Sequence, residues 1–252
     1  MIIWGSGRQE CRPYGTIRGD DMCGRYFIFD NNDVYELQRI IDEVQRSLNQ
    51  GVSLKTHGEI FPTDVVPVRV LANSGKRELV SIAAKWGFLA PGMSRSIINA
   101  RMETIVEKAM FRNAVRCLVP ASNYFEWETV IPKEEKPPDE PVQLSFDGLF
   151  GQGPAQSIDK NSQKPRKEKR AIRPTGQRGV FYMAGLLRYE PGAAIPEFTI
   201  VTRDAALTLA YIHDRMPLIL SEAHIMDWLQ KGTLPKLAEW DDGLMGYSAT
   251  PA

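Results

Sequence analysis

The chain has 252 residues, enough for one large domain or two small ones, and its 43% hydrophobic and 25% charged residues are ordinary for a globular protein. With 31 basic and 31 acidic residues the formal net charge is zero, which excludes a polycation that holds nucleic acid by bulk charge but leaves room for a local basic groove. No run approaches the roughly 18 apolar residues of a membrane-spanning helix and no signal peptide is visible, so we expect a cytoplasmic protein.

The first patterned elements begin at Met22. Residues 1–21 are rich in Gly and Arg without any period, which predicts a disordered tail or an extension from a misplaced start codon. The apolar run Tyr26–Phe29 predicts a strand, and polar residues that can cap a helix follow it. An amphipathic helix ending before Gly51 is then predicted by apolar residues at spacings of three and four: Val34, Leu37, Ile40, Ile41, Val44 and Leu48.

Further along the chain, strands and helices mix without regular alternation, which favours an α+β fold over a doubly wound one. We expect strands at Val65–Leu71, Leu79–Lys85, Arg116–Val119, Val180–Arg188 and Phe198–Thr202. We expect helices around Thr104–Arg112, Arg203–Tyr211 and Ser221–Gln230. Pro67 weakens the first of these strands or places it at a sheet edge, because proline cannot donate a ladder hydrogen bond.

One segment, from Pro132 to Arg178, is dominated by Pro, Gly, Lys, Glu and Gln. Its second half, Lys160–Arg178, holds eight basic residues and one acidic residue. This composition favours a solvated, disordered insertion within a domain that spans residues 22–252. The alternative is an auxiliary arm that contacts nucleic-acid phosphates.

The three cysteines differ in what their neighbours suggest. Cys11, Cys23 and Cys117 form no C-x-x-C pair, so neither a disulfide framework nor a zinc site is expected, and no cofactor is implied. Cys117 lies in an apolar run, which is typical of an inert buried thiol. Cys23 follows Met22, so removal of the methionine would place a thiol and an α-amine on neighbouring carbons. Such an aminothiol condenses with an aldehyde to a Schiff base and then to a thiazolidine.

Two further side chains could transfer protons. His213 stands among charged residues before a Met-Pro turn, and a histidine titrates near neutral pH. Glu126 lies between Phe125 and Trp127, where burial would raise its pKa and make it a usable acid or base. Taken singly, a surface carboxylate and an ordinary histidine are the competing interpretations.

Alternation along two short segments suggests ligand-binding faces. Asn99 and Arg101 would point the same way in an extended chain and suit a sugar oxygen and a phosphate, or they are structural hydrogen-bonding groups. Trp86 and Phe88 alternate in the same manner and could stack on bases, or they belong to the core.

These residues fall into motifs that, in this order, resemble those of the SOS response-associated peptidase (SRAP) family. The matching segments are Met22–Arg25, Trp86–Leu89, Asn99–Glu103, Arg116–Trp127 and His213–Pro217. The similarity spans roughly Met22 to Tyr247 without the insertion. The resemblance implies a single α+β domain with a barrel-like, mostly antiparallel β core flanked by helices. Its implied function is to bind single-stranded DNA and trap abasic sites covalently in the DNA damage response.

The resemblance also implies a role for each catalytic residue. Cys23 would be the crosslinking nucleophile, and Asn99 would hold the opened sugar near its amine. His213 would act as general acid and base, and Glu126 would assist N-terminal self-processing and reversal of the crosslink. For the DNA, Arg25 and Arg101 would hold phosphates and Trp86 would line the DNA path. We expect a monomer that associates with the nucleoid when bound to DNA.

The sequence departs from the family pattern in three places: residues 1–22 precede the cysteine, Ala90-Pro91-Gly92 replaces a Pro and a second Trp, and the insertion is long. Two alternatives remain at this point. A cysteine peptidase acting on other proteins would use Cys23, His213 and either Asn99 or Glu126. A non-catalytic module for single-stranded DNA would need no nucleophile.

Overall fold

The structure is a computed structural model that describes residues 24–28, 35–48, 51–73, 77–89, 92, 94–131, 164–177, 179–230 and 246–252. Cys23, the expected N-terminal tail and residues 132–163 of the expected insertion therefore lie outside the described residues. The strands are β1 (Tyr26–Ile28), β2 (Gly58–Ile60), β3 (Val65–Leu71), β4 (Leu79–Trp86), β5 (Asn99–Arg101), β6 (Val115–Ala121), β7 (Asn123–Val130), β8 (Arg166–Pro174), β9 (Phe181–Arg188), β10 (Glu197–Asp204), β11 (Arg215–Pro217), β12 (Ile219–Leu220) and β13 (Tyr247–Pro251). The helices are α1 (Tyr35–Ser47), the 3₁₀ helix η1 (Met102–Thr104), α2 (Ala109–Arg112) and α3 (Glu222–Leu229).

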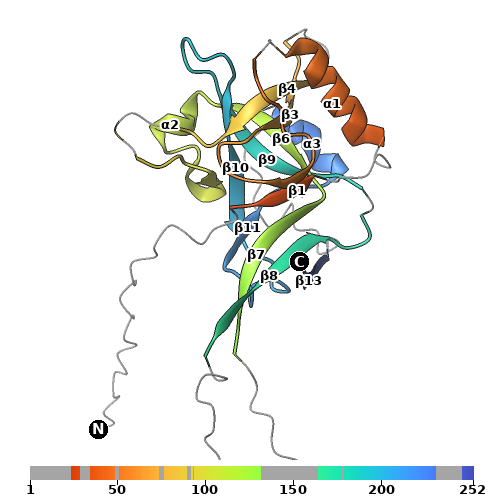
Figure 1. Cartoon of the computed structure of the whole chain (residues 1–252). Helices are drawn as coiled ribbons and strands as arrows, with labels where there is room; N and C mark the ends of the chain where they lie inside the picture. The colour runs from red at the N-terminus through yellow and green to blue at the C-terminus, as the bar shows by residue number, and fades with distance from the viewer. Residues whose placement is uncertain are drawn as a thin grey trace, which may run out of the picture.

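The strands form two sheets (Figure 1). In the larger sheet, β10 pairs with β4, β4 with β3, β3 with β6, β6 with β9, and β9 again with β10, so these strands close into a ring. The smaller sheet has the order β13-β8-β7-β1-β2 and is antiparallel throughout. The expected α+β domain with a barrel-like, mostly antiparallel core is confirmed, since among the described pairings only β10–β4 and β10–β5 are parallel.

Helices cover the outside of this core. The apolar stripe of α1 buries Leu37, Ile40, Ile41 and Val44 and packs on β3 and β4, as the spacing predicted. Helix α3 packs on β6, where the indole of Trp228 donates a 3.0 Å hydrogen bond to the carbonyl of Cys117. Within the described ranges, every helix is too short or too polar to cross a membrane.

Most expected strands are found close to their predicted bounds, and β3 coincides with the predicted Val65–Leu71. Pro67 is accommodated inside the sheet, because β3 pairs with β6 only at Arg69 and Val70, beyond the proline. The helix predicted around Arg203–Tyr211 is wrong. The chain there continues β10 through Asp204, which pairs with β11, and then makes a series of turns.

The prediction of a disordered insertion is also wrong for the last part of that segment. Residues 166–174 form β8, which pairs with β7 along its length and with β13, and the β7–β8 ribbon projects beyond the core (Figure 1). The high charge of this segment concealed a strand whose charges are neutralised by neighbours: Arg170 lies 2.6 Å from Glu128, and Arg166 lies 2.7 Å from Glu168. Ile172 supplies the buried anchor that the composition did not indicate.

Candidate functional site

His213 lies two residues before Arg215, the first residue of β11, in the connection that returns from β10. Its Nδ1 atom accepts a 2.9 Å hydrogen bond from the backbone N–H of Arg215 and lies 3.0 Å from a carboxylate oxygen of Asp214. The ring is 17% exposed, and Nε2 has no partner among the described residues. The Arg215 N–H thus holds Nδ1 as an acceptor, which leaves Nε2 for a substrate.

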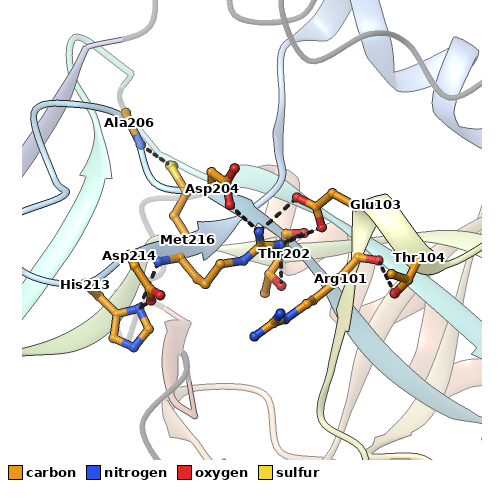
Figure 2. A network of polar contacts seen from close by, with 10 residues as sticks. Arg101, Glu103, Thr104, Thr202, Asp204, Ala206, His213, Asp214 and Met216 are labelled. Carbon is orange, nitrogen blue, oxygen red and sulfur yellow. Dashed lines mark hydrogen bonds and ion pairs between the residues drawn. The ribbon is translucent and has the colours of Figure 1, made fainter. Parts of the chain in front are cut away.

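The buried guanidinium of Arg215 is the centre of an ion network (Figure 2). It makes two contacts with Glu103, at 2.9 and 3.0 Å, and further contacts with the carboxylate of Asp204 and, at 2.8 Å, the carbonyl of Thr202. Although burial lowers the pKa of Arg215, the hydrogen bonds and charges of Glu103 and Asp204 raise it above its ordinary value. The network therefore fixes a permanent positive charge, 8% exposed, beneath the site.

The pKa of Glu103 is shifted in the opposite direction to that of Arg215. Burial raises the pKa of its carboxyl group, but the hydrogen bonds and charge of Arg215, with a smaller contribution from Arg101, hold that pKa below its usual value. Because Glu103 follows Arg101 by two residues and Arg215 follows His213 by two residues, the ion pair joins the two segments that carry them.

Arg101 and Asn99 lie on β5, which pairs in parallel with β10 so that Asn99 is opposite Ile200 and Arg101 opposite Thr202. Ala100 between them is buried at 1% exposure, which confirms the predicted alternation. Arg101 is exposed, and within the part of the chain that is described its guanidinium has no bonded partner. It is therefore available to an anionic ligand near the Arg215 network (Figure 2).

A second group of predicted residues lies where β1 meets β7. The backbone N–H of Phe125 donates a 3.0 Å hydrogen bond to the carbonyl of Arg25, and Tyr26 pairs with Tyr124. Continuing this antiparallel register by two residues brings Gly24 opposite Glu126. Glu126 is 2% exposed, so of the two interpretations that the sequence left open it is the buried carboxylate and not a surface one.

The side chain of Arg25 is enclosed by aromatic rings and a carboxylate. Its guanidinium lies 4.8 Å from the ring centre of Phe61, 5.0 Å from that of Trp127 and 3.2 Å from Glu59. It retains 39% side-chain exposure, which leaves part of its charge accessible to solvent. Burial raises the pKa of Glu59, but the hydrogen bonds and charges of Lys169 and Arg25 outweigh this effect and hold that pKa below its usual value. This carboxylate therefore stays ionised beside the two cations.

Trp86 is not part of an exposed DNA path, and that prediction is wrong. Its side chain is 0% exposed, its indole N–H donates to the carbonyl of Ile98 at 3.0 Å, and its ring meets Tyr26 edge-on at 5.3 Å. Phe88 is equally buried. A ring enclosed in this way cannot stack on a base. Trp86 instead links β1, which follows Cys23 in sequence, to the residue before Asn99.

The one cysteine within the described residues is Cys117, which is 0% exposed on β6, and burial raises the pKa of its thiol far above the ordinary value. The prediction that it is inert is confirmed, because the thiolate is the reactive form. The described part of the chain contains no cluster of side chains suited to a metal ion.

Sequence reasoning assigned no role to Glu103, Asp204 or Arg215. Glu103 and Arg215 stand inside the recognised motifs, and their placement two residues after Arg101 and His213 was an available signal. Asp204 carried no local signal, because its pairing with Arg215 depends on the β10–β11 register.

Comparison with known proteins decides the family. The sequence model of the family described as SOS response associated peptidase (SRAP) matches residues 22–247. The chain belongs to the SRAP family. Two relatives from Bacillus subtilis (strain 168) have the name abasic site processing protein: YobE is 27% identical over 232 residues, covering 85% of each chain, and YoaM is 28% identical, covering 85% of this chain and 82% of the relative.

A relative of the SRAP domain also occurs in an animal. The abasic site processing protein HMCES of Xenopus tropicalis is 29% identical over 181 residues, covering 65% of this chain and 48% of the relative. A crystal structure of a phage-related protein from Bordetella bronchiseptica superposes with a TM-score of 0.56 at 21% identity, covering 91% of this chain and 94% of that one. This likeness supports the fold alone.

Proposed function

We propose that this SRAP domain binds single-stranded DNA and traps abasic sites covalently, with Cys23 as the N-terminal residue of the processed chain. The names of its relatives, abasic site processing proteins, support this substrate. The observation on this chain that carries the proposal is the 3.0 Å hydrogen bond from the Phe125 N–H to the Arg25 carbonyl, which joins the segment after Cys23 to β7 next to the buried Glu126. The protein would act as a monomer, at the nucleoid when bound to DNA.

Covalent connectivity limits where the nucleophile can be. Cys23 lies outside the described residues, but its α-carbon is bonded through one peptide to Gly24 and so lies about 3.8 Å from that of Gly24. Gly24 in turn precedes Arg25, whose carbonyl is hydrogen-bonded to Phe125 next to Glu126, in the middle of β7. We assign Glu126 to the proton transfers that expose the amine during self-processing and that release it when the crosslink reverses.

The reaction begins with the aldehyde of the ring-opened abasic sugar. The α-amine of Cys23 adds to the aldehyde carbon, and the carbinolamine oxygen leaves as water when His213 protonates it from Nε2. The nitrogen then returns one proton to His213, which leaves a neutral Schiff base. The thiol sulfur then bonds to the same carbon while its proton passes to the nitrogen, and a thiazolidine results. Because Nδ1 accepts the hydrogen bond from the Arg215 N–H, the ring proton is carried on Nε2, the nitrogen that we assign to this step.

The positions of the other predicted residues suit the DNA backbone and the sugar. Arg101 presents an exposed guanidinium on β5, and Arg25 presents a partly exposed one on β1. We assign both to phosphates, and Asn99, on the same face as Arg101, to an oxygen of the opened sugar. Single-stranded DNA leaves the sugar accessible without unpairing a duplex.

Intact and blocked N-termini test the proposal directly. Protein beginning at Cys23 is mixed with an oligonucleotide that contains one abasic site, and heat-stable adducts are resolved on a denaturing gel. Acetylation of the α-amine, with the thiol left free, should abolish the adduct, and Cys23→Ser should leave only an imine that borohydride traps. An undiminished adduct after acetylation would refute thiazolidine formation and favour a simple thiol nucleophile, as in a cysteine peptidase.

Self-processing has its own measurement. The full chain is expressed with and without Glu126→Gln, and the intact mass of each product is determined. We expect the wild-type chain to begin at Cys23 and the variant to retain more of residues 1–22. If both products begin at Cys23, Glu126 has no part in processing, and translation from Met22 followed by removal of that methionine accounts for the terminus.

A further inference from the structure

The chain between β10 and β11 has two different sides. Its backbone is fixed at both ends, since Ala205 N–H donates to Asp214 at 2.8 Å and His213 N–H donates to Leu209 at 3.3 Å. A further bond of 3.0 Å from Ala210 to Ala206 gives the segment a helical turn. One side is anchored in the core, where Leu209 is 3% exposed and Ile212 is 8% exposed.

The opposite side carries two large side chains that the fold leaves in solvent. Leu207 is 95% exposed and Tyr211 is 63% exposed. They are four residues apart, a spacing that places side chains next to each other on a helical turn. Because Leu209 and Ile212 are anchored in the core, Leu207 and Tyr211 point into solvent. Packing in the core therefore does not explain why these two positions carry large apolar side chains.

Charge around the pair indicates what kind of partner it can meet. No charged residue lies between Asp204 and Asp214, whose carboxylates are 79% and 73% exposed. Two exposed carboxylates repel phosphates, so the complementary surface is an uncharged ring or base rather than a DNA backbone. Leucine and tyrosine both bind such surfaces, by insertion between bases and by stacking.

The position of Leu207 and Tyr211 relative to His213 determines which bases of the strand they can contact. The α-carbons of Tyr211 and His213 are at most about 7 Å apart, since each residue spans at most about 3.5 Å. One nucleotide step is about 3.4 Å along a stacked strand. A sugar held at Nε2 of His213 therefore brings the adjoining nucleotides to this pair.

We infer that Leu207 and Tyr211 bind the bases beside the abasic site, Leu207 entering the gap left by the missing base and Tyr211 stacking on a flanking base. The inference rests on the proposed function and adds to it a means of selecting abasic strands. A gap in the base stack admits an apolar side chain without unstacking a base, whereas an intact strand must be unstacked first.

The test uses the full chain and a single-stranded oligonucleotide that carries a tetrahydrofuran abasic analogue flanked by 2-aminopurine. The analogue has no aldehyde, so binding is measured without crosslinking or Cys23. The proteins compared are wild type, Leu207→Ser, Tyr211→Ser and Tyr211→Phe. Tyr35→Ser is the matched control, because Tyr35 is 77% exposed on α1, which lies well apart from β11 in Figure 1.

Loss of one stacking contact should weaken binding between about fivefold and a hundredfold for Tyr211→Ser and remove part of the 2-aminopurine quenching. Tyr211→Phe and Tyr35→Ser should match wild type. Leu207→Ser should weaken binding of the abasic strand more than that of the same strand with every base present. Melting temperatures should stay close to wild type, since both side chains are exposed.

Each other result counts against the inference. If both serine variants bind like wild type, the inference is wrong while the proposed function stands, and the pair is left as a protein contact. If Tyr211→Phe is as defective as Tyr211→Ser, a hydroxyl contact replaces stacking and the inference is again wrong. If wild type binds neither strand, both the inference and the proposed function are overturned.

Discussion

The guanidinium of Arg215 and the carboxylate of Glu103 meet through two N–H···O contacts of 2.9 and 3.0 Å, although 112 residues separate them in sequence. This ion pair joins η1, directly after Arg101, to β11, which begins two residues after His213. The proposed phosphate-binding side chain and the proposed general acid therefore have one common support. Weakening that support should affect stability in a way that depends on pH.

Glu103→Gln should destabilise the protein at neutral pH and have no effect in strong acid. Because the folded-state pKa of Glu103 is lowered, its contribution to stability is full above the unfolded-state pKa of about 4.3 and is lost as the pH falls through the lower folded-state value. Urea unfolding of wild type and variant between pH 7 and pH 2 measures the difference. Glu107→Gln, at an exposed position, is the control, and a difference that persists unchanged to pH 2 would contradict the assignment.

Trp86→Phe should destabilise the fold without changing DNA affinity. The variant leaves the Ile98 carbonyl without its indole donor and opens a cavity between Tyr26 and Phe198, so we expect a loss of about 2–4 kcal/mol in the free energy of unfolding. Denaturant unfolding and binding of the folded variant to single-stranded DNA measure the two effects. Weaker binding by a variant shown to be fully folded would restore a direct DNA contact for Trp86.

Arg101→Ala should weaken DNA binding and reduce its dependence on salt. One lost phosphate contact lowers the slope of log affinity against log salt concentration by roughly one unit. Titrations at several salt concentrations give that slope. Arg39→Ala, which removes an exposed arginine from α1, should leave it unchanged, and an unchanged slope for Arg101→Ala would place this residue away from the DNA.

His213→Gln should slow crosslinking by about a hundredfold or more while DNA binding persists. Glutamine can accept a hydrogen bond from the Arg215 N–H but cannot supply a proton at neutral pH, so only proton transfer is removed. Single-turnover crosslinking with saturating protein measures the rate. His57→Gln, in the loop before β2, should react like wild type, and an equal loss for the two variants would argue against general acid catalysis.

Local sequence determined those features that a short segment encodes by itself. The spacing of apolar residues predicted α1, and the apolar run Val65–Leu71 predicted β3, because side chains on one face of a helix or strand recur with its period. The motif order identified the family, and alternation placed Asn99 and Arg101 on one face. These features depend on residues within a few positions of one another.

Tertiary structure alone decided the features that depend on partners far along the chain. The apolar segment after Arg203 has a helical composition, yet pairing with β11 extends β10 to Asp204. Arg170 of β8 meets Glu128 of β7 and Lys169 of β8 meets Glu59 of β2, the ring of Trp86 is enclosed between β1 and β10, and Glu103 meets Arg215 across 112 residues. Strand pairing and burial are set by which distant segments meet, and that information is absent from the period or composition of any single segment.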